Sequence, residues 1–214
     1  MRSVLTLVTP PAVEPVTLAE AKAWARIDGT DDDAVLTALI AAARGAAEEF
    51  LRRSLIAQTW RLTLDQTYSR SYDDLPEGIY DLPITALYGG LPQSLALPKG
   101  PVSAVTSVTT YDLSNVSSVY AASNYRVDAA GGRFLLNYGA VWPSSVRPDG
   151  GTEILYVAGY GAAPASVPQP IRTGILIHVA SLFEQRGLCE DAMALPPGTE
   201  QLYRPYRIVG DRRG

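Results

Sequence analysis

The chain has 214 residues, of which 47% are hydrophobic and 19% are charged, a composition typical of a globular protein with a sizeable core. The net charge of −4 and the pI near 5.0 argue against a nucleic-acid-binding surface spread over the whole molecule. A single cysteine excludes an internal disulfide and a single histidine leaves no Cys/His cluster for zinc, so we expect no metal and no cofactor.

The sequence contains no uninterrupted apolar run of about 18 residues, the length expected of a membrane-spanning helix. Residues 1–9 also lack the length and cleavage pattern of a secretion signal. We therefore expect a soluble protein that is made in the cytoplasm and has no membrane partner.

Residues 1–16 are predicted to form an extended arm. The prolines at positions 10, 11 and 15 lack a backbone donor and disfavour helix in the residue before each of them. A helix is expected over Thr17–Ile27, where Thr17 and Glu20 have the spacing of a capping box.

A second and longer helix is expected over Thr30–Ser54, forming a hairpin with the first. Thr30 and Asp33 resemble another capping box at its start. Its apolar residues recur three or four positions apart, which places them on one face. These residues are Val35, Leu36, Leu39, Ile40, Ala43, Ala47, Phe50 and Leu51.

From Ile56 onward the apolar period changes to two, because Trp60, Leu62 and Leu64 alternate with polar residues. Glycine-containing turns separate the segments that follow, which favours a small antiparallel sheet or barrel over a parallel α/β fold. The further strands are expected at Gly78–Leu82, Ser94–Leu97, Val102–Tyr111, Ser117–Ala121, Tyr125–Val127, Arg133–Leu136 and Thr152–Tyr160.

Helical periodicity returns at Ile171 and is expected to stop at Gly187, followed by a short helical turn at Thr199–Tyr203. The predicted fold class is α+β, a helical bundle formed by N- and C-terminal helices with an inserted antiparallel β module. We expect four regions: the arm and helical hairpin (1–55), the β-rich module (56–165), the C-terminal helices that complete the bundle (166–206), and a basic tail (207–214).

No group of residues predicts an active site, so we assign no catalytic residue. His178 lies in the apolar stripe of the third helix and is interpreted as a packed residue. The run Asp31–Asp33 fits the positive end of a helix dipole better than a magnesium site, because consecutive helical positions point in different directions. The acidic neighbours of Cys189 disfavour its thiolate and make it a poor nucleophile.

The end of the chain differs in charge from the rest. Residues 203–214 hold four arginines against one aspartate, a net charge of +3, so the remaining chain carries −7. An acidic body with a basic end suggests a tail that docks on an acidic partner. A solvated, frayed terminus is the simpler interpretation of the charge pattern alone.

Nine short motifs, in order along the chain, are shared with a known class of proteins. They are PVTLAEAK (15–22), ARIDGTDDD (25–33), LIAAAR (39–44), LIAQTW (55–60), PVSAVTSV (101–108), NYRVD (124–128), VAGYG (157–161), PQPIR (168–172) and YRPYRI (203–208). Together they resemble the head-tail connector (adaptor) proteins of tailed bacteriophages and gene transfer agents. The resemblance covers nearly the whole chain.

The resemblance implies a structural subunit rather than an enzyme. The subunit would form a closed ring, expected to be a dodecamer, in the neck of a virion or gene-transfer-agent particle assembled in the bacterial cytoplasm. The ring would join the portal protein to a tail-side stopper or neck protein, and DNA would pass through its lumen without sequence-specific binding. An acidic body suits such a conduit, because a lumen that bound phosphate would retard the DNA.

The resemblance also implies that the end of the chain binds the portal, which favours docking over fraying. The matching residues are Tyr203, Arg204, Pro205, Tyr206, Arg207, Ile208, Val209, Arg212 and Arg213.

Two other function classes remain open. One is a metal-dependent hydrolase or nuclease using carboxylates of the β module, such as Asp65, Asp73 and Asp81, although these acids have no partner base. The other is a tail-side binding protein whose β module contacts a receptor or the tail tube.

Overall fold

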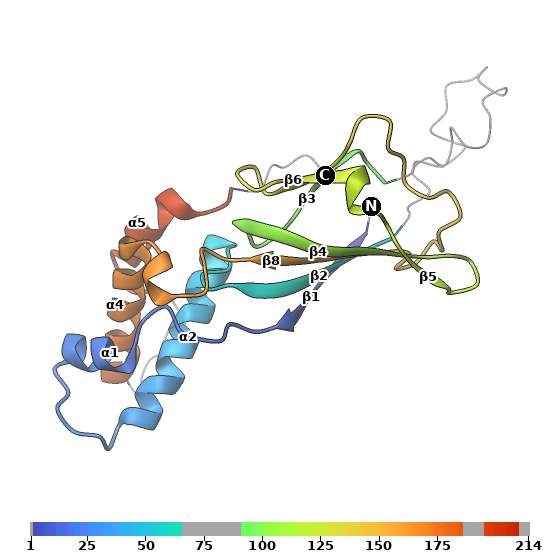
Figure 1. Ribbon diagram of the computed structural model, residues 1–214. Coiled ribbons are helices and arrows are strands. Elements are labelled where there is room, and N and C mark those ends of the chain that lie inside the picture. The colour runs from blue at the N-terminus through green and yellow to red at the C-terminus, as the bar shows by residue number, and fades with distance from the viewer. Residues whose placement is uncertain (1, 66–90, 186–194, 210–214) are drawn as a thin grey trace, which may run out of the picture. The chain divides into compact units, whose positions relative to one another are not determined.

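The computed structural model describes residues 2–65, 91–185 and 195–209 and shows an α+β protein (Figure 1). In chain order its elements are β1 (Ser3–Thr9), α1 (Leu18–Ala25), α2 (Asp33–Leu51), β2 (Gln58–Leu64), β3 (Ser94–Ala96), β4 (Val102–Tyr111), β5 (Ser117–Val119), β6 (Tyr125–Asp128), β7 (Arg133–Leu136), β8 (Thr152–Ala158), α4 (Gln169–Gln185) and α5 (Thr199–Tyr203). The predicted fold class, terminal helices with an inserted antiparallel β module, is confirmed. The expected strand Gly78–Leu82 and the expected helix stop at Gly187 lie outside the described residues.

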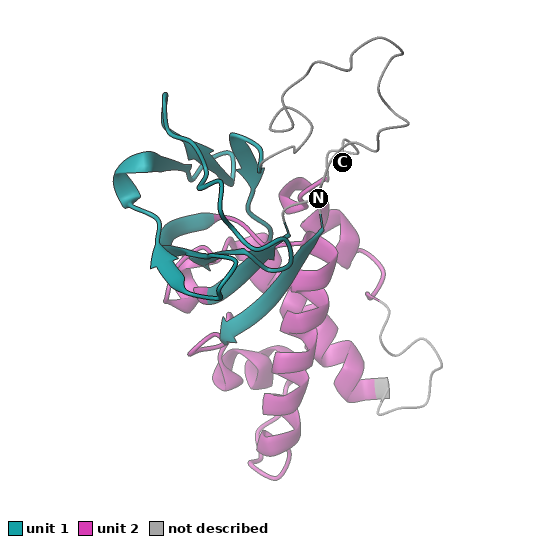
Figure 2. Ribbon diagram, turned by 90° about the vertical axis from the view of Figure 1, so that its right-hand side faces the viewer, with its two compact units in different colours: residues 1–10, 59–98, 102–157 teal, residues 11–58, 99–101, 158–214 magenta. Residues whose placement is uncertain are grey.

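The chain divides into two compact units (Figure 2). Residues 1–10, 59–98 and 102–157 form one, here called the sheet unit. Residues 11–58, 99–101 and 158–214 form the other, here called the helical unit. The first ten residues thus group with the strands, whereas the sequence predicts them in one region with the helical hairpin.

The sheet unit contains a five-stranded sheet in the order β1-β2-β8-β4-β5 and a three-stranded sheet in the order β3-β7-β6. The predicted alternation in β2 is confirmed, because Leu62 and Leu64 are buried. Part of the predicted arm is itself a strand: β1 pairs antiparallel with β2 from Ser3 opposite Leu64 to Thr9 opposite Thr59. An aromatic cluster fixes the smaller sheet, since the Tyr125 ring lies 4.7 Å from that of Phe134.

In the helical unit, α1 begins with the predicted capping box, in which both the Thr17 and the Glu20 side chains bond to backbone N–H groups. The second predicted capping box is wrong. The α2 helix begins at Asp33 after an Asp32 cap that makes no side-chain cap bond. Asp33 instead pairs with Lys22 of α1, with 2.7 Å between Nζ and Oδ1.

The predicted stripe of α2 forms much of the core of the helical unit. Leu36, Ile40, Ala43, Ala47 and Leu51 are buried, and Leu39 and Phe50 are partly buried against them. Val35 departs from the prediction and is 48% exposed. From α4, Ile171, Ile175 and Val179 enter the same core, so helices from both ends of the chain share it.

Among the helices within residues 2–65, 91–185 and 195–209, none has the length and hydropathy that a membrane span requires.

Candidate functional site

The C-terminal segment 203–209 is the site predicted from the sequence, and its first residue belongs to the core of the helical unit. Tyr203 ends α5 and is 0% exposed. Its ring lies 6.0 Å from the ring of Phe50 in α2, centroid to centroid. A Cβ atom on Gly174 of α4 would clash with the Tyr203 ring, so glycine there allows the close contact. Tyr203 therefore anchors the segment against both long helices.

The backbone that follows Tyr203 is fixed to the C-terminal end of α2. The Ile208 N–H donates to the carbonyl of Leu51 at 3.0 Å. The last carbonyls of a helix lack partners within it, so this bond satisfies one that would otherwise need water. The guanidinium of Arg53 donates through Nε to the carbonyl of Tyr206. The segment is thus held in place as far as residue 208.

The segment exposes its charged residues and partly covers two of its larger apolar side chains. Arg204, Pro205, Arg207 and Val209 are exposed, whereas Tyr206 and Ile208 are half-buried. The Arg207 guanidinium carbon lies 4.8 Å from the centroid of the Phe50 ring, a cation–π arrangement that orients an exposed charge. Arg212 and Arg213 lie outside the described residues.

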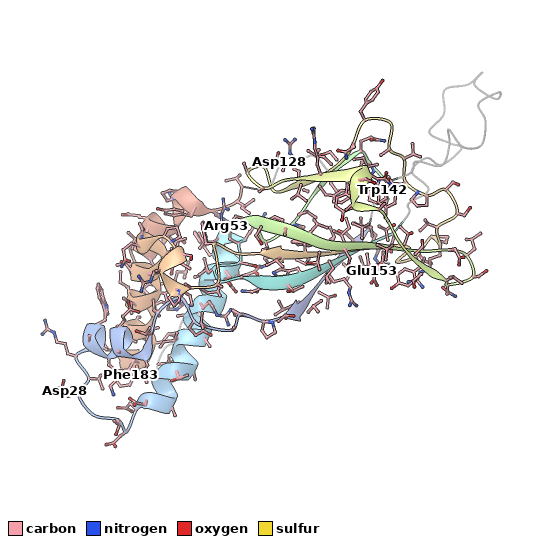
Figure 3. All side chains as sticks on the ribbon, viewed as in Figure 1. Asp28, Arg53, Asp128, Trp142, Glu153 and Phe183 are labelled. Carbon is pink, nitrogen blue, oxygen red and sulfur yellow. The ribbon has the colours of Figure 1, made fainter. Side chains whose placement is uncertain are left out.

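Two cationic side chains from other parts of the sequence, Arg53 and Lys99, belong to the neighbourhood of the C-terminal segment (Arg53 is labelled in Figure 3). Besides its bond to Tyr206, Arg53 forms an isolated β-bridge with Lys99. The Lys99 ammonium lies 3.2 Å from a carboxylate oxygen of Glu49, whose side chain is 85% exposed. Sequence reasoning missed both cations, because only the fold brings them to the C-terminal segment. The basic pair Arg52–Arg53 after an apolar helix was the one available signal.

The hydroxyls of Tyr203 and Tyr160 add no negative charge to this neighbourhood. Burial raises the pKa of Tyr203. Burial also raises the pKa of Tyr160. The charge of Arg53 lowers that pKa, and Tyr206 raises it, but burial is the largest effect. Both hydroxyls therefore stay neutral at physiological pH.

His178 is packed, as interpreted from the sequence. It is 2% exposed, and neither ring nitrogen has a hydrogen-bond partner in the part of the chain that the structure describes. Burial lowers its pKa, so the imidazole is neutral at pH 7. No nucleophile is bonded to it within that part, so it does not resemble a catalytic base.

Of the three candidate acids of the β module, only Asp65 lies within the described residues. Asp65 accepts a hydrogen bond from the Gly150 N–H at 2.8 Å, which is a structural role at the end of β2. Asp73, Asp81 and Cys189 lie outside the described residues. Within residues 2–65, 91–185 and 195–209, no group of three or more His, Cys, Asp or Glu side chains could hold a metal ion.

Comparison with known proteins identifies relatives of the chain. The family described as phage gp6-like head-tail connector protein matches residues 15–126. No curated protein matches. Among solved structures, a chain in the neck of an empty gene transfer agent (GTA) particle, computed with C6 symmetry, is 25% identical with a TM-score of 0.73, and the match covers 99% of this chain and 98% of that one.

Two further solved chains have the same fold. One, from the virion of a native GTA particle, is 25% identical with a TM-score of 0.72, and the match covers 98% of each chain. The other, from the neck of a native GTA particle computed with C12 symmetry, is 24% identical with a TM-score of 0.68, covering 99% of this chain and 98% of that one. The similarity therefore includes the C-terminal segment.

Proposed function

Because the chain belongs to the phage gp6-like head-tail connector family, we propose that it forms a closed ring in the neck of a phage or GTA particle and binds the portal through its C-terminal segment. Membership in this family makes the protein a structural head-tail connector, not an enzyme. The observation that carries the proposal is the family match over residues 15–126, together with similarity to a GTA neck protein over 99% of the chain.

The ring is a symmetric neck assembly, and a dodecamer is one closed ring compatible with the C6 symmetry of the related neck. On its other side the ring meets a tail-side stopper or neck protein. DNA passes through the lumen without sequence-specific binding. The charge of −7 outside residues 203–214 supports this arrangement, since a negative conduit does not retain phosphate.

Three features of the C-terminal segment support its role in portal binding. It is attached at Tyr203 and Ile208, so little backbone freedom is lost up to residue 208 when a partner binds. It presents the guanidinium groups of Arg204 and Arg207, which suit bidentate contacts with carboxylates. Repetition around a ring makes each later contact effectively intramolecular, so individually weak contacts give a durable joint.

The structure determines where a truncation should begin. Deleting Tyr203–Gly214 would remove a core side chain, so loss of binding could reflect unfolding. Deleting residues 209–214 leaves the bonds of Tyr206 and Ile208 in place, and Val209 is 86% exposed. We expect this shorter deletion to weaken co-assembly with purified portal without changing the thermal midpoint.

A double substitution that removes two positive charges from the segment gives a second test. Arg204→Ala with Arg207→Ala should weaken portal binding, and the loss should shrink as salt rises because the contact is electrostatic. The control is Arg126→Ala, which removes an exposed arginine from β6 in the sheet unit. Portal binding that survives both the deletion and the double substitution, with the fold intact, would refute the assignment of the segment.

A further inference from the structure

The first strand of the sheet unit is an unusual edge. β1 ends the strand order of the five-stranded sheet, and six of its seven residues are exposed. Val4 is 52% exposed, Leu7 is 41% exposed and Val8 is 43% exposed. Residues 3–13 contain no charged side chain. A shift of register between Leu7 and Thr9 is the one irregularity in the pairing of β1 with β2.

The opposite edge of the same sheet is likewise exposed, aliphatic and uncharged. β5 is the last strand of the order, and all three of its residues are exposed. Leu113, Val116 and Val119, in the β4–β5 hairpin, are 72%, 62% and 76% exposed. Residues 113–125 contain no charged side chain.

The turn between β4 and β5 has an apolar tip but is bonded by polar side chains on both sides of it. The Asp112 carboxylate accepts hydrogen bonds from the N–H groups of Ser114 at 2.8 Å and Val116 at 2.9 Å. Arg147 donates to the Asn115 side chain at 3.0 Å, and its guanidinium carbon lies 4.3 Å from the centroid of the Tyr111 ring. These bonds hold the aliphatic tip in one conformation, which lowers the entropic cost of docking.

Edge strands present unpaired N–H and C=O groups, and soluble proteins usually protect them with charged residues or proline. Neither edge of this sheet carries a charge along its strand. An uncharged aliphatic edge is the surface onto which another chain can add a strand. One sheet therefore offers two such surfaces, on different elements.

We propose that the β1 edge of one copy docks on the β4–β5 hairpin of the next copy, so that the two edges of the sheet form the contact between neighbouring subunits. The inference rests on the ring of the proposed function. A ring with cyclic symmetry needs two different, complementary patches on each copy. The two uncharged edges meet that requirement, whereas a tail-side partner seated on one edge would leave the other uncovered.

The proposal is tested by cross-linking with the full-length chain and portal. Val8→Cys and Val119→Cys are made as two separate variants, both in a Cys189→Ser background. Each variant by itself, and an equal mixture of the two, is assembled on portal and then treated with a short bismaleimide. We expect dimers in the mixture and none with either variant alone, because β1 meets the hairpin and not another β1. A double variant should give a ladder of multimers.

The remaining outcomes separate this proposal from the proposed function. Rings seen on portal by electron microscopy, with no cross-link in the mixture, would overturn the edge contact and leave the connector function standing. Cross-linking by Val8→Cys alone would also overturn it. If the wild-type chain forms no ring on portal, both proposals are refuted.

A charge substitution gives an independent readout. Val8→Lys should weaken subunit association on the order of tenfold, because an unpaired ammonium is costly to bury. Its matched control is Val35→Lys, at a valine of α2 that is 48% exposed. Equal association of the two variants, with unchanged circular dichroism, would contradict the proposal.

Discussion

Replacing Tyr203 with alanine should lower the free energy of unfolding by about 4 kcal/mol, the usual cost of truncating a buried aromatic side chain. The estimate follows from the contacts of Tyr203, which is 0% exposed and lies 6.0 Å from the Phe50 ring. Gly174 cannot fill the vacated space, so the cavity persists. For a chain of this length the loss corresponds to a thermal midpoint lower by about 10 °C.

Tyr203→Phe separates the ring from its hydroxyl. The hydroxyl is buried and has no hydrogen-bond partner in the described part of the chain. Removing it should leave the stability unchanged or raise it by about 1 kcal/mol, because an unsatisfied buried hydroxyl carries a desolvation penalty. Urea unfolding followed by circular dichroism measures both variants, and hydrogen exchange at the Ile208 amide reports whether the segment stays attached.

Two results would refute this reasoning. A cost below about 1 kcal/mol for Tyr203→Ala would mean that the ring is not part of the core, since surface substitutions have effects of that size. Slow exchange at Ile208 in the alanine variant would mean that the segment is held by its backbone bonds alone. In either case Tyr203 would not be the anchor of the C-terminal segment.

Thr17→Ala should destabilise the protein by about 1 kcal/mol through loss of the capping box, whereas Thr17→Ser should not; equal thermal midpoints would count against the cap. Gly159→Ala should cost about 3 kcal/mol, because the residue has φ of 136° and an added Cβ would lie 2.5 Å from the Ile56 carbonyl, and a soluble variant of unchanged stability would contradict this. Gly45→Ala, in open space on α2, should instead stabilise by about 1 kcal/mol in the same urea assay. Burial raises the pKa of Glu48 from its usual 4.5, against the lowering effect of bonds from Leu55, Arg44 and Gln58, so the folded state binds the proton more tightly than the unfolded state does. The stability of the wild type relative to Glu48→Gln should therefore fall as pH rises from about 4.5 through the folded-state pKa, and a rise over that range would reverse the assignment.

Local signals in the sequence predicted much of the fold. The Thr17–Glu20 spacing located the start of α1, and the bounds of β4 and β7 match the predicted strands. These elements have strong periodicity or capping chemistry of their own. The strand β1 was predicted only as extended chain, because its pairing with β2 depends on a segment 50 or more residues away.

The candidate site was predicted less completely. Charge and family resemblance predicted residues 203–209 as a candidate site, but they did not distinguish the buried Tyr203 from the exposed Arg204. That difference arises from the gap at Gly174, which is a tertiary feature. Arg53 and Lys99 were missed for the same reason, since each reaches the neighbourhood through the fold. The start of α2 was predicted wrongly because Lys22 pairs with Asp33.

The division of the chain has a mechanical consequence. Neither unit is one continuous stretch, because the backbone passes between them after residues 10, 58, 98, 101 and 157. Tension between the units would be shared by five covalent connections, whereas two domains joined by one linker would transmit it through a single chain. A connector between head and tail that is built this way can bear tension between its two units through the backbone, without relying on non-covalent contacts between them.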